Sequence, residues 1–259
     1  LAINKPAGIT SFEVIRRLRK ITGIRKIGHT GTLDPFATGL LICCIGSYTR
    51  LSSFLEQEDK TYIATMKLGI KTTTGDPEGE ILQTAPVPVF SDKLAALEAK
   101  ALELTELSVP AYSAVKIQGK RAYELARQGE TLNLPQRPVT ISEFKFWAEE
   151  QNAPDELTYY CRVSKGTYIR TLSEWLAEQI QTLAYTIFLT RESIGKITLK
   201  DAVALDDLNR DNWINSQISY QQVFPDWTCL QLSEEEHYKV INGMDIAFSE
   251  SSSAKILLL

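Results

Sequence analysis

The stretch GHTGTLDPFATGLL, residues Gly28–Leu41, is the most informative segment of this chain. Gly28 and Gly31 permit a tight backbone path and the close approach of a ligand. Asp34 precedes a proline, which disfavours the helical region for Asp34 and can project its carboxylate from a fixed turn. Taken alone, the pattern is equally consistent with an Asp-Pro turn that starts a helix. The apolar run Gly39–Ile45 predicts a buried strand.

The residues before this stretch predict one strand and one helix. The strand covers Leu1–Asn4. Thr10 and Glu13 form a capping-box pattern, which predicts a helix over Phe12–Ile21. We expect the interior face of this helix to carry Val14, Ile15 and Leu18. We expect Gly23 to end the helix.

The remaining elements follow from periodicity and from glycine and proline positions. Predicted strands or extended segments are Lys60–Leu68, Tyr112–Ile117, Leu157–Val163 and Tyr185–Leu189. Predicted helices are Ser91–Leu102, Arg121–Gln128, which Gly129 would cap, and Thr171–Ile180. Predicted loops are Lys26–Thr38 and Lys71–Gly79. The order has no regular βαβ alternation, so we expect an α/β (α+β) fold with a mixed, mainly antiparallel sheet flanked by helices.

The chain changes character near Asp226. Leu230–Ile246 has a short apolar start, then an acidic helix opening and an Asn-Gly pair, and Leu257–Leu259 could form a strand. We therefore expect a main domain over residues 1–225 and a short C-terminal appendage over residues 226–259.

Composition narrows the class of protein. The chain has 259 residues, 44% of them hydrophobic and 23% charged, a balance typical of globular domains. No apolar run reaches the roughly 20 residues of a membrane span, and LAINKP does not resemble a signal peptide. The chain starts at Leu1 rather than Met, so we expect that a few leading residues are missing. We expect a cytoplasmic protein.

The cysteines and histidines do not predict a metal site. The chain has four cysteines and two histidines, without a C-x-x-C pair. Adjacent Cys43 and Cys44 would point to opposite faces of a strand, so they could neither form a disulfide with each other nor bind one metal ion together. We therefore expect no metal and a reducing compartment.

Positive charge is clustered although the net charge is −4 and the isoelectric point is about 5.4. One group precedes the His29 motif and a second follows Pro110; their members are Arg16, Arg17, Arg19, Lys20, Arg25 and Lys26, then Lys116, Lys120, Arg121 and Arg127. Two solvated helix faces would explain these clusters without a ligand. Contacts with nucleic-acid phosphates are the functional alternative.

Common nucleotide-binding and hydrolase motifs are missing from the sequence: it contains no Walker loop, no G-x-G-x-x-G and no G-x-S-x-G. Five segments instead resemble TruB-type tRNA pseudouridine synthases, in the same order. They are KPAGITS at Lys5–Ser11, GHTGTLDPFATGLL at Gly28–Leu41, DKTYIATMKLG at Asp59–Gly69, PAYSAVKIQGKRAYELARQG at Pro110–Gly129 and SKGTYIRTL at Ser164–Leu172. The resemblance extends from Leu1 to about Asp226.

The resemblance implies formation of pseudouridine at position 55 in the T-loop of tRNA, without metal or organic cofactor. It implies that Asp34 is the catalytic residue and that Arg170 pairs with it and keeps it ionised. It further implies that Tyr62 packs on the flipped target base, and that the other contacts to RNA come from His29, Tyr168 and Leu189, with Asp76 near the RNA groove. Whether Asp34 attacks C1′ or C6 stays open. We expect a monomer that binds the tRNA T-arm and no membrane.

Some segments depart from the family pattern. Gln181-Thr182-Leu183-Ala184 stands where relatives often have Gly-Cys-Gly-Ala, and Glu174-Trp175 replaces a common acidic pair. The tail resembles only the opening of the family's PUA-like RNA-binding module, so residues 226–259 would be short or incomplete.

Three alternatives remain open at this stage. The chain could be an RNA-binding relative without catalysis, although binding alone needs no buried Asp–Arg pair. It could also pseudouridylate another RNA. A glycoside hydrolase usually needs two carboxylates about 5–10 Å apart, and the sequence suggests no second acid for Asp34.

Overall fold

The computed structural model describes residues 1–113, 115–117, 119–128, 133–147, 153–246 and 256–258. The chain divides into two compact units, Leu1–Gln217 and Ile218–Leu259. The predicted helix cap Gly129 lies outside the described residues.

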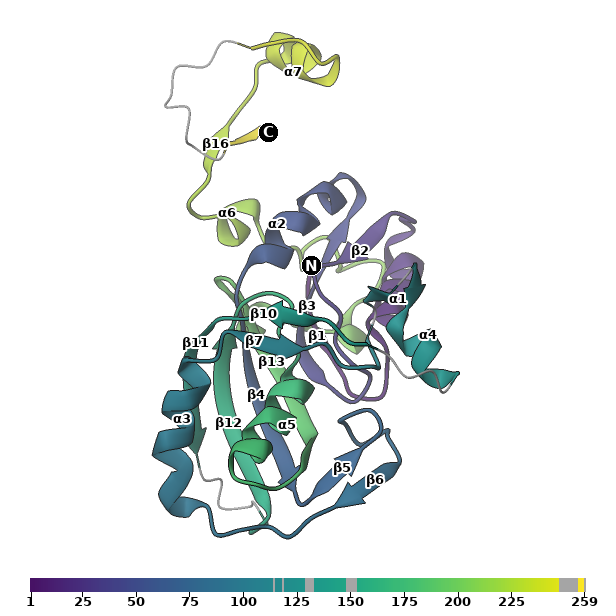
Figure 1. The fold of residues 1–259 in the computed structure, drawn as a ribbon. Coiled ribbons are helices and arrows are strands. Elements are labelled where there is room, and N and C mark those ends of the chain that lie inside the picture. The colour runs from purple at the N-terminus through teal and green to yellow at the C-terminus, as the bar shows by residue number, and fades with distance from the viewer. Residues whose placement is uncertain (114, 118, 129–132, 148–152, 247–255, 259) are drawn as a thin grey trace. The chain divides into compact units, whose positions relative to one another are not determined.

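A mixed, mainly antiparallel sheet forms the centre of the first unit, as predicted (Figure 1). Its strands run in the order β11-β12-β4-β13-β3-β1-β15, with β14 paired to β13 and β2 to β3. Their bounds are β1 Ala2–Lys5, β2 Ile27–His29, β3 Thr38–Ile45, β4 Lys60–Leu68, β11 Ile141–Trp147, β12 Glu156–Val163, β13 Ala184–Ile194, β14 Ile197–Thr198 and β15 Val203–Ala204. Only the β13–β3 and β1–β15 pairs of this described sheet are parallel.

Helices and short ribbons surround the sheet. The helices are α1 Ser11–Thr22, α2 Ser52–Gln57, α3 Leu94–Leu102, α4 Ala122–Arg127 and α5 Ile169–Gln179. Short 3₁₀ helices are η1 Gly46–Leu51, η2 Ser91–Lys93, η3 Leu199–Asp201 and η4 Leu205–Asp207. The two-stranded ribbons pair β5 Ile70–Thr72 with β6 Ile81–Thr84, β7 Glu106–Ser108 with β10 Gln136–Pro138, and β8 Lys116–Ile117 with β9 Lys120–Arg121.

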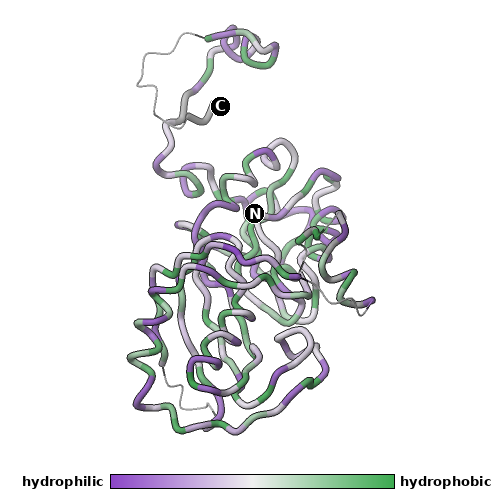
Figure 2. Tube along the Cα trace, in the orientation of Figure 1, coloured by the Kyte–Doolittle hydropathy of each residue, from purple (hydrophilic) through white to green (hydrophobic). Residues whose placement is uncertain are grey.

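Two apolar clusters make up the core. The larger one joins β4, β11, β12 and β13 to α3 and α5, through side chains such as Met66, Leu97 and Leu172. The smaller one packs α1 against β1 and β3 through Leu18, Leu41 and other fully buried residues. Apolar residues recur along these strands and helices in the hydropathy-coloured trace (Figure 2). The core therefore holds the strands that carry the site residues in fixed register.

Helix α1 confirms the prediction from its capping residues. The Thr10 side chain accepts a hydrogen bond from the Glu13 backbone N–H, and Gly23 closes the helix in the left-handed region, with φ 73°. The Glu13 carboxylate does not complete the capping box, because it accepts hydrogen bonds from Arg16 instead. Amphipathic spacing then buries Val14, Ile15 and Leu18.

Other predictions were only partly correct. Residues 26–38 are not all loop, because β2 pairs with β3, and β5 occupies the start of the predicted loop Lys71–Gly79. The strand predicted at Tyr185–Leu189 continues to Ile194, because β13 pairs with β4 along its length and with β14 at its end. Within Tyr112–Ile117, the described residues are extended only at β8. Long-range pairing explains these differences, since alternation within a segment does not report it.

Gln181 takes an unusual backbone conformation directly after α5. Its φ is 62°, and it is the only non-glycine residue with positive φ in the described ranges. Its N–H donates to the Glu178 carbonyl, and the Thr182 N–H donates to the Ala177 carbonyl, which closes the helix end. The left-handed turn that favours glycine is therefore formed here with glutamine.

The second unit contains short elements: α6 Tyr220–Val223, β16 Thr228–Leu230, α7 Glu234–Ile241 and β17 Ile256–Leu258. Strands β16 and β17 pair in parallel. Helix α7 starts with a complete capping box between Ser233 and Glu236, which explains the acidic opening of this segment.

Across the described part of the chain, no helix is long and apolar enough to cross a membrane. The same residues contain no group of three or more metal-ligating side chains. The described cysteines Cys43, Cys44 and Cys161 are free thiols, and all three are buried.

Candidate active site

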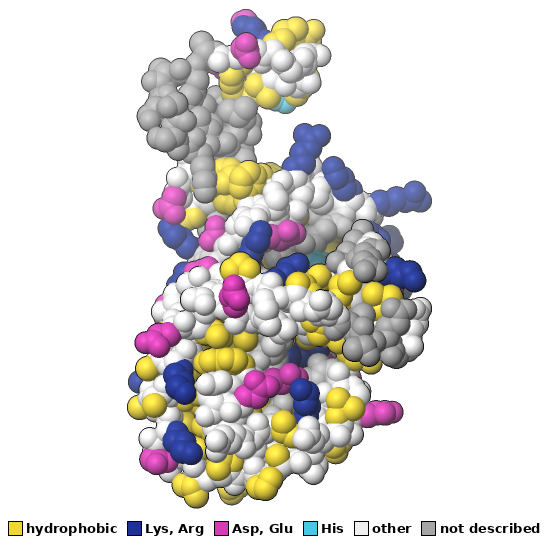
Figure 3. All heavy atoms as spheres, in the orientation of Figure 1, with side chains coloured by type: hydrophobic (Ala, Val, Ile, Leu, Met, Phe, Trp, Pro, Cys, Tyr) yellow, Lys and Arg dark blue, Asp and Glu magenta, His cyan; other side chains and the backbone are white. Residues whose placement is uncertain are grey.

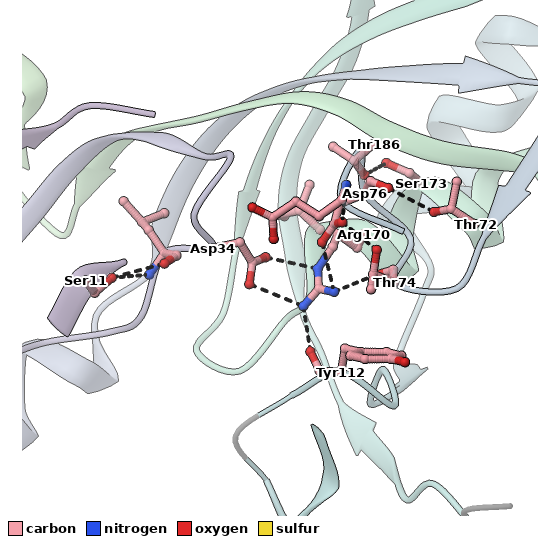
Figure 4. Close-up of polar contacts among 12 residues, drawn as sticks. Ser11, Asp34, Thr72, Thr74, Asp76, Tyr112, Arg170, Ser173 and Thr186 are labelled. Atoms are coloured by element: carbon pink, nitrogen blue, oxygen red, sulfur yellow. Dashed lines mark hydrogen bonds and ion pairs between the residues drawn. The ribbon is translucent and has the colours of Figure 1, made fainter. Parts of the chain in front are cut away.

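The carboxylate of Asp34 is held by the guanidinium of Arg170 (Figure 4). Arg170 Nε lies 3.0 Å from Asp34 Oδ2, and Nη2 donates to Oδ1 at 3.3 Å. This two-point contact fixes the orientation of the carboxylate. The Arg170 side chain is 4% exposed and that of Asp34 is 31% exposed, so the arginine is buried while the carboxylate stays accessible.

Three further groups fix Arg170 itself. Its Nη1 donates to the Thr74 carbonyl at 2.6 Å and to Asp76 Oδ2 at 3.4 Å. Its Nη2 donates to the Tyr112 carbonyl at 2.9 Å. Figure 4 shows the guanidinium beside Asp34 and Asp76, with Tyr112 below it. A buried arginine with two carboxylates and two carbonyls has its charge balanced and cannot rotate freely.

The turn that carries Asp34 is anchored on both sides by the segment Lys5–Ser11. Ser11 Oγ accepts from the Leu33 N–H at 2.9 Å and donates to the Leu33 carbonyl at 3.1 Å. The Pro35 carbonyl accepts from the Gly8 N–H at 2.8 Å and from Lys5 Nζ at 3.2 Å. Two of the segments that suggested the family thus form one structural unit around Asp34.

Burial raises the pKa of the Asp34 carboxyl above its ordinary value. The positive charge of Arg170 opposes this rise, and the negative charge of Asp76 adds to it. The carboxylate is therefore both aimed and more basic than an exposed aspartate, which suits a nucleophile or a proton acceptor.

Tyr62 and Leu189 lie in the larger apolar cluster, together with Leu33, which precedes the aspartate. Tyr62 is 8% exposed and lies on β4, while Leu189 lies on the neighbouring β13, opposite Ala64. The structure thus places both predicted residues in the same apolar cluster as Leu33, the residue next to Asp34.

His29 and Tyr168 lie at the ends of two elements, β2 and α5. His29 ends β2, and its Nδ1 accepts from the Gly31 N–H at 3.4 Å. Burial and the charge of Arg191 lower the pKa of His29, which favours the neutral imidazole. Tyr168 caps α5 two residues before Arg170. Among the described contacts, neither side chain forms a hydrogen bond to Asp34.

Two buried cations near the turn were not predicted as site residues. Lys5 is fully buried and donates to the carbonyls of Pro6, Ile9 and Pro35. Desolvation lowers the pKa of Lys5 to about 8, although the charge of Asp34 opposes this. Arg191 is 1% exposed. Lys5 begins one of the family segments, but no local pattern marks Arg191.

The first basic cluster is only partly available to a ligand. Arg16 forms two hydrogen bonds with Glu13, and Arg17 pairs with Asp206 at 3.0 Å. The exposed members without an ion pair among the described residues are Lys20, Arg25 and Lys26. Lys and Arg side chains project around β2 and α1 on the face drawn in Figure 3. In the second cluster Lys120 is exposed, and the side chains of Lys116, Arg121 and Arg127 lie outside the description.

Fold and site together define a class of protein: a mixed-sheet protein with one accessible carboxylate held by a buried arginine. Comparison with known proteins identifies the family. Residues 19–169 match the N-terminal domain of the TruB family pseudouridylate synthases. tRNA pseudouridine synthase B of Burkholderia lata is 39% identical over 258 residues, which cover 96% of this chain and 77% of that protein. The same-named protein of Nitrosococcus oceani is 37% identical over 260 residues, with 98% and 83% covered.

The chain therefore belongs to the TruB family and is a pseudouridine synthase, an isomerase that converts uridine into pseudouridine. Solved structures share its fold. A chain of a Cbf5–Nop10–Gar1 complex superposes with a TM-score of 0.65 at 21% identity, covering 94% of this chain and 67% of that chain. A chain of an H/ACA RNP bound to a substrate RNA containing 2′-deoxyuridine also gives 0.65 at 21% identity, covering 100% and 74%.

Proposed function

We propose that this enzyme isomerises uridine 55 in the T-loop of tRNA, with Asp34 as its catalytic residue. The observation that carries the proposal is the two-point contact between Arg170 and the accessible carboxylate of Asp34. The substrate assignment is supported by relatives named tRNA pseudouridine synthase B that are 37–39% identical over almost the whole chain.

The reaction breaks the N1–C1′ bond, turns the uracil and forms a C5–C1′ bond. The C5 proton leaves, and N1 gains a proton, so the product is an isomer of the substrate. Asp34 can add to C1′ or to C6, or assist departure of the base, because each role needs an anionic oxygen at a fixed place. Arg170 keeps that oxygen aimed and favours its ionised form.

The target nucleotide has to leave its stack to reach Asp34, which costs a few kcal/mol. In our proposal, Tyr62 and Leu189 form the apolar surface that receives the uracil, and stacking on an aromatic ring is worth about 1–3 kcal/mol per base. His29 fills the space that the base vacates, and Tyr168 contacts the nucleotide. A neutral His29 suits this role because it brings no charge into the base stack.

The rest of the tRNA is held through its backbone. Exposed Lys20, Arg25 and Lys26 would contact phosphates of the T-arm, while the site reads the flipped uridine. We take the enzyme to be a cytoplasmic monomer. We also propose that residues 226–259 belong to a PUA-like C-terminal module.

Mapping of the product tests this proposal. An unmodified tRNA transcript is incubated with the protein, and pseudouridine is located along the RNA. We expect it at position 55 and expect none in a transcript with cytidine at that position. Pseudouridine at another site only, or no pseudouridine at all, would contradict the assignment.

A further inference from the structure

Arg191 lies where the strands that carry the site residues meet. It is part of β13 and pairs with Tyr62 on β4 and with Gly39 on β3. The backbone of β13 passes so close to β3 that a Cβ at Gly39 would lie 2.4 Å from the Arg191 carbonyl oxygen. The position of the Arg191 side chain is therefore tightly constrained.

The guanidinium of Arg191 joins the sheet to the loop that carries Asp34. Its Nε donates to the Leu40 carbonyl at 2.7 Å, and its Nη2 donates to the Gly31 carbonyl at 3.0 Å. Gly31 lies midway between His29 and Asp34 and has a φ of 138°. Arg191 is thus hydrogen-bonded to the middle of the loop. Among the described residues, no other site residue donates a side-chain hydrogen bond to Gly31.

The charge of Arg191 is costly to bury. The side chain is 1% exposed, and it forms no ion pair among the described residues. An interior ion without an opposite charge carries a desolvation penalty, which an apolar side chain at this position would avoid. The rigid fork of the guanidinium must therefore make interactions that offset the cost of burying its charge.

The loop has three anchors spaced along its length. At the start of the loop, the Thr30 N–H donates to the Ile42 carbonyl and Arg191 donates to the Gly31 carbonyl. Just before the aspartate, Ser11 Oγ accepts from the Leu33 N–H. The Ser11 anchor fixes only the residue next to Asp34. Without the Arg191 anchor, the loop could shift at Gly31, a residue with wide backbone freedom.

We propose that Arg191 is a positioning residue for pseudouridine formation. Its fork holds Gly31 to β3 at Leu40, and this link keeps the loop from His29 to Asp34 in the geometry in which Asp34 meets Arg170. The inference rests on the proposed role of Asp34. It concerns the rate of the chemical step, and Arg191 makes no contact with the RNA.

The test compares Arg191→Lys and Arg191→Gln with the wild-type enzyme on tRNA tritiated at uridine C5. Neither side chain has the rigid planar fork through which Nε and Nη2 reach the Leu40 and Gly31 carbonyls from one fixed position. We expect kcat to fall by about 10- to 100-fold, as for a misplacement of about 1 Å, while tRNA affinity stays within about twofold. Arg162→Lys on β12, where the arginine is 41% exposed, is the matched control and should keep full activity.

A wild-type kcat in a folded Arg191→Lys or Arg191→Gln variant would overturn the inference. So would a loss of kcat that is matched by an equal loss of tRNA binding, or failure of both variants to fold, because each outcome makes the residue merely structural. Absence of tritium release by the wild-type enzyme would instead contradict the proposed function, so the two failures are distinguishable.

Discussion

Arg170 contacts both carboxylate oxygens of Asp34, Oδ2 at 3.0 Å and Oδ1 at 3.3 Å, from the first turn of α5. The two residues are 136 positions apart in the sequence. Asp34 reaches this place because Ser11 and Gly8 hold the residues on either side of it. Arg170 reaches it because Thr74, Asp76 and Tyr112 occupy its remaining donors.

The first prediction concerns the pH dependence of catalysis. Burial raises the pKa of Asp34, and the ionised fraction of a carboxyl is lost as the pH falls through its pKa in the folded enzyme. The acidic limb of kcat should therefore lie at higher pH than the titration of an exposed aspartate. Asp76→Asn removes a charge that raises this pKa, so the limb should move to lower pH. A pH–rate series under single-turnover conditions measures the shift.

The control for this series is Asp155→Asn, which removes an acid that pairs with Lys67 on the protein surface. Its acidic limb should coincide with that of the wild-type enzyme. An unchanged or upward-shifted limb in Asp76→Asn would contradict the electrostatic description of the site.

The second prediction concerns the contact between β3 and β13. In Gly39→Ala the new Cβ would meet the Arg191 carbonyl oxygen at 2.4 Å and its nitrogen at 2.7 Å, at a φ of 100°. Steric overlap and backbone strain together should lower the free energy of unfolding by about 3 kcal/mol. Gly46→Ala has a φ of 64° and open space around the Cβ, so it should cost only about 1–2 kcal/mol. Urea unfolding of the two variants compares them, and equal costs would contradict the close approach.

The third prediction concerns Gln181. A side chain in the left-handed region is strained, so Gln181→Gly should raise the unfolding free energy by about 0.5–1 kcal/mol and the melting temperature by about 2–4 °C. Gln179→Gly, within α5, should instead destabilise by about 1 kcal/mol. Thermal unfolding distinguishes the two variants. A lower melting temperature in Gln181→Gly would show that the glutamine side chain stabilises this turn.

The fourth prediction concerns binding of tRNA through phosphates. Replacing Lys20, Arg25 and Lys26 by alanine should weaken binding, and should reduce the slope of log affinity against log salt by about 2–3 if all three contact phosphates. Replacing Arg16 and Arg17 should change the slope less, because both already pair with acids. Binding titrations at several salt concentrations give the slopes. Equal effects in the two sets would contradict a phosphate-binding role for the exposed cluster.

Alternation and capping residues predicted those strands and helices whose formation depends on neighbouring residues in the sequence. The strand predicted at Lys60–Leu68 has the same bounds as β4, and the helix predicted at Phe12–Ile21 lies within one residue of both ends of α1. Strand β2 was missed because its three residues are extended only through pairing with β3. The register that sets Tyr62 opposite Arg191 is likewise a property of the assembled sheet.

The site was predicted only through the resemblance to a family. Nothing in the local sequence indicates that Arg170 and Asp34 meet, because the contact depends on how α5 packs on β13 and on the loop after β2. The buried cations Lys5 and Arg191 were missed for the same reason: in sequence, a lysine or arginine in a strand suggests an exposed side chain. Their carbonyl partners become visible only in the folded chain.

The most direct test of the central claim is tritium release from tRNA labelled at uridine C5, measured for the wild-type enzyme and for Asp34→Asn. The asparagine keeps the shape of the side chain but removes the charge that Arg170 holds. We predict release by the wild-type enzyme and none above background by Asp34→Asn, with tRNA binding largely retained. Sustained turnover by Asp34→Asn would contradict the assignment of Asp34 as the catalytic residue.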